Sequence, residues 1–156
     1  MIKAILDGVV AAFNDANIKA AAAYPAAELC DAESIVAVAV KSMRVYSSGL
    51  GSYIGVCTEN GEVKELYGEK AETVLSLDIY CPGESDEGCT ELADKVRRAL
   101  YSAEGISVTE FDFGLPAYDA DSRMFRSKST AKAVACLVRE KRGRRLGSYS
   151  IGEGSV

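Results

Sequence analysis

The sequence has no histidine among its 156 residues, and it has no long apolar run. Histidine is the usual general base of enzymes and a common zinc ligand, so its absence weighs against both kinds of site. No stretch approaches about 18 uninterrupted apolar residues, which argues against a membrane-spanning helix. The first apolar run ends before Asp7, which makes it too short for a signal peptide. We therefore expect the protein to stay where it is made.

The five cysteines follow no spacing that is typical of a metal site or a redox site. Cys81 and Cys89 lie eight positions apart, unlike the close pairs of zinc knuckles and redox motifs. We predict free thiols that pack as small apolar groups in a reducing cytoplasm. The sequence indicates no metal and no cofactor.

Two short motifs resemble catalytic or phosphate-binding signatures but lack the context that such chemistry needs. Gly49, Gly51 and Gly55 do not have the spacing of either phosphate-binding loop. Ser129 and Lys132 match a serine-x-x-lysine pattern, whose chemistry requires both residues on neighbouring helical turns. Here the surrounding residues alternate as in a strand, which would place the two side chains on opposite faces.

Carboxylates are plentiful, but they crowd into turns. One group spans residues 84–87, and a second consists of Asp119 and Asp121. A hydrolase would need two acids that converge in a cleft, and a calcium loop would need further ligands at fixed positions. Both groups are more typical of a solvated surface. We therefore predict that the protein is not an enzyme and has no catalytic or metal-binding residues.

Hydrophobic periodicity predicts two helices and several strands. Apolar residues at helical offsets indicate helices over 2–13 and 89–102. Expected strands are 18–23, 34–46, 53–57, 63–67, 72–81, 106–113 and 130–139. The alanine-rich run at 18–23 could also continue the first helix, but the asparagine-rich break before it and Pro25 after it favour a strand. Asn60-Gly61 predicts a hairpin turn, and 116–129 is expected to be a polar loop. This order predicts an α+β fold, a mainly antiparallel sheet with two α-helices packed on one face.

The composition changes after residue 140, so we predict a single domain over 1–140 and a C-terminal arm over 141–156. Residues 141–145 are basic and 147–156 are rich in glycine and serine. Such a segment cannot bury enough apolar surface to order itself, which predicts a flexible arm. Its basic run could contact phosphate, contact an acidic face of another copy, or remain solvated.

The candidate interaction residues lie in this arm and in a cluster of the polar loop. Tyr149 and Ile151 are compatible with a strand that adds to a neighbour's sheet edge. The complete set of predicted protein-interaction residues is Lys141, Arg142, Arg144, Arg145, Tyr149, Ile151, Arg123, Phe125 and Arg126.

The order and length of these elements resemble the tail terminator (tail completion) proteins of tailed bacteriophages and phage-tail-like particles. The resemblance covers about residues 1–140 and rests on element order more than on fixed motifs. Its features are the amphipathic first helix, Tyr24-Pro25, the strand 35–40, the segment 51–55, the strand 73–80, the helix opened by Gly88-Cys89 with Leu92, Val96 and Leu100, and Tyr118-Asp119 before the last strand.

The resemblance implies a structural role without catalytic residues. Members form a ring, commonly of six subunits, which caps the tail tube, ends tail polymerisation and provides a docking surface for the head or collar. The implied partners are further copies of the chain, the tail tube protein, the sheath, and head-tail connector or collar proteins. DNA would at most pass through the ring lumen, and no membrane is involved. Such a protein is made in the bacterial cytoplasm and incorporated into the virion or tail-like particle.

Two alternatives remain open from the sequence. The first is a head-tail connector protein of the same particle, which would share the helix-and-sheet layout. The second is a ferredoxin-like small-molecule-binding regulatory domain, in which the apolar strands and the glycine-rich loop would form the pocket. An enzyme ranks last, because it would have to work with acids, lysine or cysteine alone.

Overall fold

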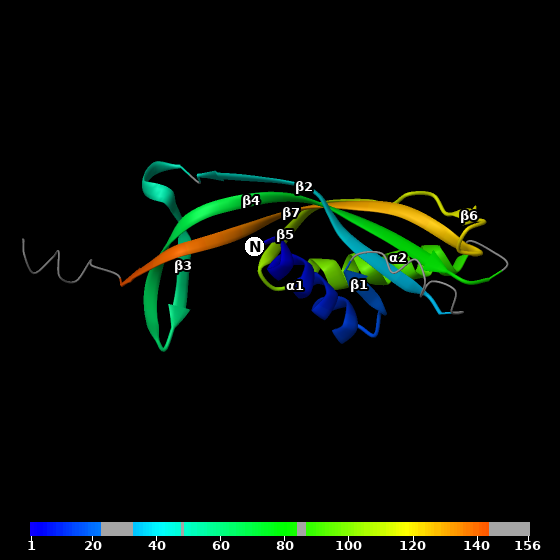
Figure 1. The fold of residues 1–156 in the computed structure, drawn as a ribbon. Coiled ribbons are helices and arrows are strands. Elements are labelled where there is room, and N and C mark those ends of the chain that lie inside the picture. Colours follow the sequence, from blue (N-terminus) through cyan, green and yellow to red (C-terminus); the bar gives the residue numbers. More distant parts are fainter. Residues whose placement is uncertain (23–32, 48, 84–86, 144–156) are drawn as a thin grey trace, which may run out of the picture. The chain divides into compact units, whose positions relative to one another are not determined.

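The computed structural model describes residues 1–22, 33–47, 49–83 and 87–143. Within these residues two α-helices and a mixed, mostly antiparallel sheet confirm the predicted α+β class (Figure 1). The elements are α1 (Ile2–Asp15), β1 (Ala20–Ala22), β2 (Ile35–Ser47), the 3-10 helix η1 (Leu50–Ser52), β3 (Tyr53–Glu59), β4 (Glu62–Cys81), α2 (Glu87–Tyr101), β5 (Ile106–Asp112), β6 (Ala117–Asp119) and β7 (Met124–Gly143).

The described strands form one hydrogen-bonded sheet in the order β1-β2-β4-β7-β5. Two further strands lie off this path, with β3 paired to β4 and β6 paired to β7. The pairing of β1 with β2 is parallel, whereas β3–β4, β5–β7 and β6–β7 are antiparallel. The short β1 confirms that the alanine-rich segment after α1 forms a strand and does not continue the helix.

The chain divides into two compact units. Unit 1 comprises Met1–Arg44 and Glu72–Ala135, and unit 2 comprises Val45–Ala71 and Cys136–Val156. The strands β2, β4 and β7 each contribute residues to both units. The boundary predicted at residue 140 falls inside β7, because the strand continues to Gly143.

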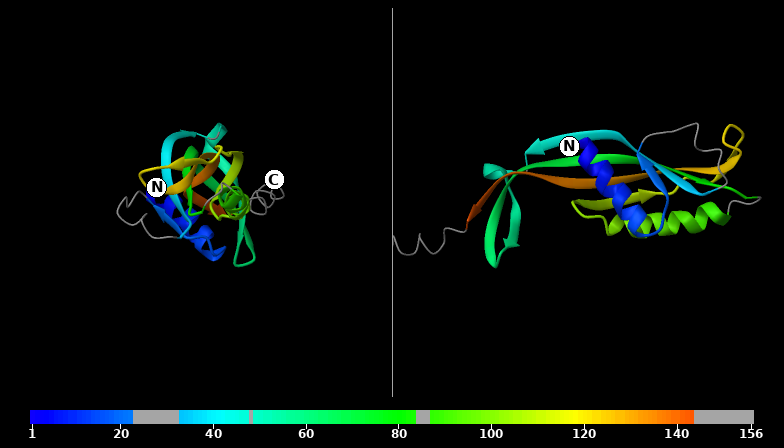
Figure 2. Two further views of the ribbon diagram at one scale, coloured as in Figure 1. Left: turned by 90° about the vertical axis from the view of Figure 1, so that its right-hand side faces the viewer. Right: turned by 60° about the horizontal axis from the view of Figure 1, so that its bottom comes forward.

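Unit 1 has a hydrophobic core between its strands and its two helices. Both helices lie on one face of the sheet, as predicted, and the right-hand view of Figure 2 brings them in front of the strands. The helix α1 buries Ile5, Val9 and Phe13 at four-residue intervals. Alternate positions of β4, among them Leu75 and Leu77, are fully buried. Burying one such side chain contributes about 1.5–3 kcal/mol.

A smaller apolar cluster involves the other face of β4. It contains Ile35, Ala37, Tyr80 and Met124, with Ala21 packed against it. Successive strand residues point to opposite faces, so Tyr80 lies on the face opposite to Ile79, the fully buried residue before it in β4. The cluster explains why the first four residues of β2 are all buried. The apolar run at 35–40 predicts burial on both faces; residues 35–38 are buried, whereas Ala39 and Val40 are only half-buried.

The structure corrects the prediction of two separate strands at 63–67 and 72–81. A single strand, β4, runs from Glu62 to Cys81. A Cβ atom at Gly68 would lie 1.9 Å from the carbonyl oxygen of Leu137, so this glycine permits close contact between the backbones of β4 and β7. Gly68 is therefore required for the close packing of these two strands.

The structure also corrects the polar loop predicted at 116–129 and the last strand predicted at 130–139. The strand β7 begins at Met124, because its first residues pair with β6 in a short hairpin. Tyr118 is directly opposite Phe125 in this hairpin. The sequence predicted a loop here because Ser127 and Ser129 are polar, but both side chains are buried in the strand. They are satisfied by bonds to the backbone of Gly114 and to each other.

Candidate interaction surfaces

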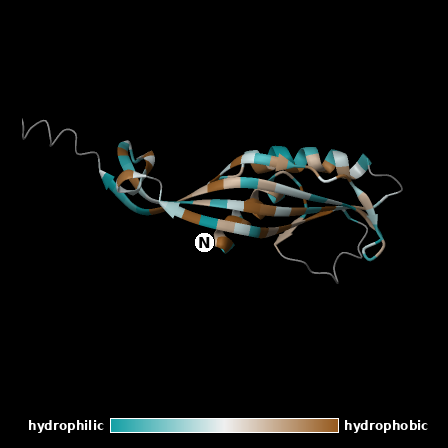
Figure 3. Cartoon of the chain, turned by 90° about the horizontal axis from the view of Figure 1, so that it is seen from above, coloured by the Kyte–Doolittle hydropathy of each residue, from teal (hydrophilic) through white to brown (hydrophobic). Residues whose placement is uncertain are grey.

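Unit 2 is a sheet without a hydrophobic core in the residues that the structure describes. Among the described residues, the buried apolar ones belong to unit 1, except Ala71, which lies at the boundary between the two units in the sequence. Large apolar side chains of unit 2 are instead exposed: Val45, Leu50, Tyr53, Val56 and Val138. Leu50 is 99% exposed. Figure 3 shows how hydrophobic and hydrophilic residues alternate along the strands.

A β-bulge gathers apolar side chains on one face of unit 2. The register places Tyr53 opposite Tyr67 and Val56 opposite Glu65, with an irregularity between Tyr53 and Gly55. Because residues 65 and 67 share a face, Tyr53 and Val56 also share it, although three positions separate them. Gly55 has a φ of 145°, which favours glycine at the bulge.

The same face receives side chains from the end of β7. The guanidinium of Arg142 lies over the ring of Tyr67, 4.3 Å from its centroid. Val138 is four residues before Arg142 in the strand and therefore points to the same side. We call this set the aromatic face. It consists of Tyr53, Val56, Tyr67, Val138 and Arg142.

Ring contacts and hydrogen bonds fix the centre of the aromatic face. Tyr53 and Tyr67 meet edge to face with ring centroids 5.8 Å apart. The hydroxyl of Tyr67 donates a hydrogen bond of 2.7 Å to Glu65, and this bond is the main reason that the pKa of Tyr67 is raised. Arg142 donates to both carboxylate oxygens of Glu140, which holds the guanidinium in place over the ring. Tyrosine and arginine in such arrangements are enriched at protein interfaces.

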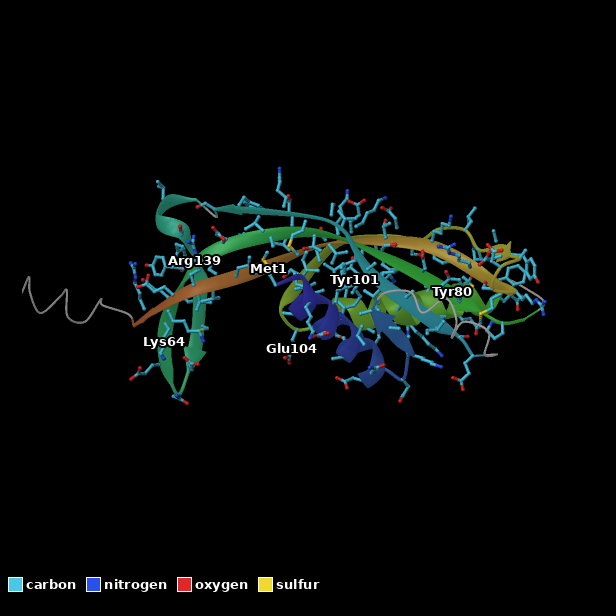
Figure 4. The ribbon with its side chains drawn as sticks, in the orientation of Figure 1. Met1, Lys64, Tyr80, Tyr101, Glu104 and Arg139 are labelled. Carbon is cyan, nitrogen blue, oxygen red and sulfur yellow. The ribbon has the colours of Figure 1, made fainter. Side chains whose placement is uncertain are left out.

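The opposite face of unit 2 carries ion pairs. The carboxylate of Glu59 lies 2.9 Å from the ammonium of Lys64 and 3.5 Å from that of Lys141. The hydrogen bond from Lys64 is the largest cause of the lowered pKa of Glu59, and the charge of Lys141 lowers it further. Arg139 pairs with Glu69 at 3.1 Å, and Figure 4 shows Lys64 and Arg139 among the side chains around these strands.

Both outer edges of the unit 2 strands are open within the described part of the chain. The strand β3 pairs with β4 alone. The strand β5 pairs with β7 only as far as Ala135, so it does not cover the edge of residues 136–143. Exposed edges present unpaired backbone donors and acceptors that can bind another strand.

The three predicted interaction residues of unit 1 do not form a single patch. Arg123 is exposed in the turn between β6 and β7. Phe125 stacks edge to face on Tyr118, with centroids 5.8 Å apart. The neighbouring Arg126 points to the other side of the strand, where it binds Asp78 at 2.8 Å.

The pair of Arg126 and Asp78 is a structural element of unit 1. The side chain of Asp78 is only 4% exposed. Arg126 also lies over the ring of Tyr80, whose pKa is raised chiefly by burial. Arg126 also lines an open cavity of about 350 Å³ beside the β6 hairpin. The other lining residues are Gly114, Leu115, Ala117, Tyr118, Asp119 and Lys128.

The remaining predicted interaction residues divide into two groups. Lys141 and Arg142 lie in β7, on opposite faces of unit 2. The others, Arg144, Arg145, Tyr149 and Ile151, lie outside the described residues, as does the rest of the predicted flexible arm after Gly143. Sequence reasoning missed the apolar members of the aromatic face. An isolated glycine within a strand is the signal that could have indicated the bulge.

Other kinds of site find little support in the described residues. No group of three or more histidine, cysteine, aspartate or glutamate side chains there could hold a metal ion. Cys81 and Cys89 are buried free thiols, whereas Cys136 is exposed. The thiol of Cys89 lies 3.4 Å from the carbonyl oxygen of Phe125.

Neither described helix has the length and apolarity that crossing a bilayer requires. Comparison of the chain with protein-family models and with curated proteins gives no match.

Proposed function

We propose that this protein is a structural subunit of a phage tail or phage-tail-like particle. Several copies form a ring that caps the tail tube, ends tube polymerisation and provides the docking surface for a head or collar. The α+β fold with two helices on one face of the sheet agrees with the element order that suggested this role. The same protein would be incorporated into the particle after synthesis in the bacterial cytoplasm.

The observation that carries the proposal is the open sheet of unit 2. A small sheet without a buried face is marginally stable in water, so it needs a partner to cover it. Its two open edges belong to different strands, β3 and β7. A contact between two different surfaces of identical chains is head-to-tail and closes into a ring when its rotation permits.

The test measures assembly directly. Native mass spectrometry and negative-stain images of the purified chain should show rings, alone or after addition of the tail tube protein of the same particle. The chain should also shorten the tubes that this tube protein forms, with ring density at one tube end. A chain that remains monomeric alone and beside the tube protein, and leaves tube length unchanged, would overturn the proposal. A monomer that retains a metabolite would favour the regulatory domain.

A further inference from the structure

The aromatic face has the composition of the centre of a protein interface. Two tyrosines, two valines and an arginine meet on one side of β3, β4 and β7. Val56 is 56% exposed and Tyr53 is 45% exposed, although both are flanked by apolar or aromatic neighbours. Aromatic and arginine side chains in a contiguous patch supply most of the energy at interfaces.

The charge of unit 2 favours a protein partner over a polyanion. The described residues of unit 2 contain five acidic and five basic side chains, so their formal net charge is zero. Nucleic acid binding needs an excess of positive charge that replaces counterions on the phosphates. The cations Arg139, Lys141 and Arg142 each already bind a carboxylate. A neutral surface with an apolar centre suits another protein.

The charge of unit 1 indicates where two copies can meet. Counted over the full sequence of each unit, unit 1 has 17 acidic against 11 basic side chains, a formal net charge of −6, and unit 2 has 6 acidic against 7 basic, a net charge of +1. Two such surfaces repel each other when they approach. The neutral surface of unit 2 lets a second copy approach without that repulsion.

We propose that the aromatic face of unit 2 is the contact surface for a second copy of this chain. The proposal rests on the proposed ring function, and it assigns the aromatic face, beside the open strand edges, to one side of the head-to-tail contact. Tyr53, Val56 and Val138 lose water on assembly, while Arg142 stays over the ring of Tyr67. The ion pairs on the opposite face keep that side polar.

The test uses the full chain and places lysine in the aromatic face. The double variant Val56→Lys/Val138→Lys should raise the concentration for half-assembly by about 100-fold or more, because burying an unpaired charge is costly. Light scattering after size-exclusion chromatography measures the mass of the assembly. The matched control Glu62→Lys adds a lysine to the opposite face, and it should assemble like the wild type. Far-UV circular dichroism reports whether each variant folds.

A milder variant covers the case in which the lysine variant unfolds. Val56→Thr/Val138→Thr keeps the side-chain shape and should weaken assembly by about tenfold, because each methyl is replaced by a hydroxyl that must lose water. If either double variant folds and assembles as well as the wild type, the assignment of this face is overturned, while the ring function stands. A wild type that never assembles, alone or with the tube protein, would overturn the ring function and this inference with it.

Discussion

The two units use the same kind of strand but differ in what covers it. In unit 1, β4 has fully buried residues such as Leu75 and Leu77, and the two described α-helices belong to this unit. In unit 2 the same strand is half-buried between Val63 and Tyr67. Backbone pairing between strands is thus present in both units. A sheet is stable by itself, however, only when an apolar face of it is covered. Unit 1 meets this requirement and the described part of unit 2 does not.

The first test of this difference truncates one apolar side chain in each unit and compares the loss of stability. Leu77→Ala in unit 1 should lower the free energy of unfolding by about 2–5 kcal/mol, because it removes fully buried methyl groups and leaves a cavity. Val56→Ala in unit 2 should change it by less than about 0.5 kcal/mol in the unassembled chain, since Val56 is exposed. Urea denaturation measures both. Equal losses would mean that unit 2 has a core of its own.

The elements that local periodicity specifies could be predicted from the sequence. The apolar positions of α1 recur at helical spacing, and its predicted span differs from the observed one only at the last turn. The uninterrupted apolar run at 35–40 likewise predicts a strand buried on both faces, and the structure shows this burial over residues 35–38. In each case the signal lies within one element and needs no knowledge of its neighbours.

The features that depend on strand partners could not be predicted. The continuity of β4 across Gly68 depends on the close backbone of β7. The aromatic face depends on a bulge in β3, which moves Val56 to the side of Tyr53. Simple alternation would have placed these two side chains on opposite faces. The aromatic face was therefore predicted only in part, through Arg142.

The second test compares an ion pair whose carboxylate is buried with one whose carboxylate is half exposed. Arg126→Met in unit 1 should lower the free energy of unfolding by about 3 kcal/mol, because it leaves the Asp78 carboxylate, 4% exposed, without its cation. The double variant Asp78→Leu/Arg126→Met should recover most of this loss. Lys64→Met in unit 2 should have a smaller effect, since the carboxylate that it leaves, Glu59, is 43% exposed and keeps Lys141 as a partner. A loss for Lys64→Met as large as that for Arg126→Met would contradict the comparison.

The third test separates local from global stability. Gly68→Ala would place a Cβ atom 1.9 Å from the carbonyl oxygen of Leu137, so β4 and β7 must move apart there. Amide hydrogen exchange in β3 should become at least about tenfold faster, while the amides of α1 keep their protection. Gly8→Ala is the control, because the nearest atom lies 3.8 Å away and the helix gains propensity. Unchanged exchange in β3 would show that the contact at Gly68 does not hold unit 2 together.

The smallest expected effect concerns an exposed turn of unit 1. It tests whether a substitution in unit 1 has a small effect on stability when the residue is not buried. The hydroxyl of Ser122 donates a hydrogen bond of 2.7 Å to Asp119, which is the main cause of the lowered pKa of that carboxyl. A lowered pKa stabilises the fold above the unfolded pKa of about 3.9, and this contribution is lost as the pH falls through the folded pKa. Ser122→Ala should therefore raise the pKa of Asp119 and weaken the acid sensitivity of the turn, whereas Ser122→Thr keeps the hydroxyl and the low pKa. Carboxyl NMR titration measures both, and equal pKa values of Asp119 in the two variants would mean that this hydrogen bond does not form in solution.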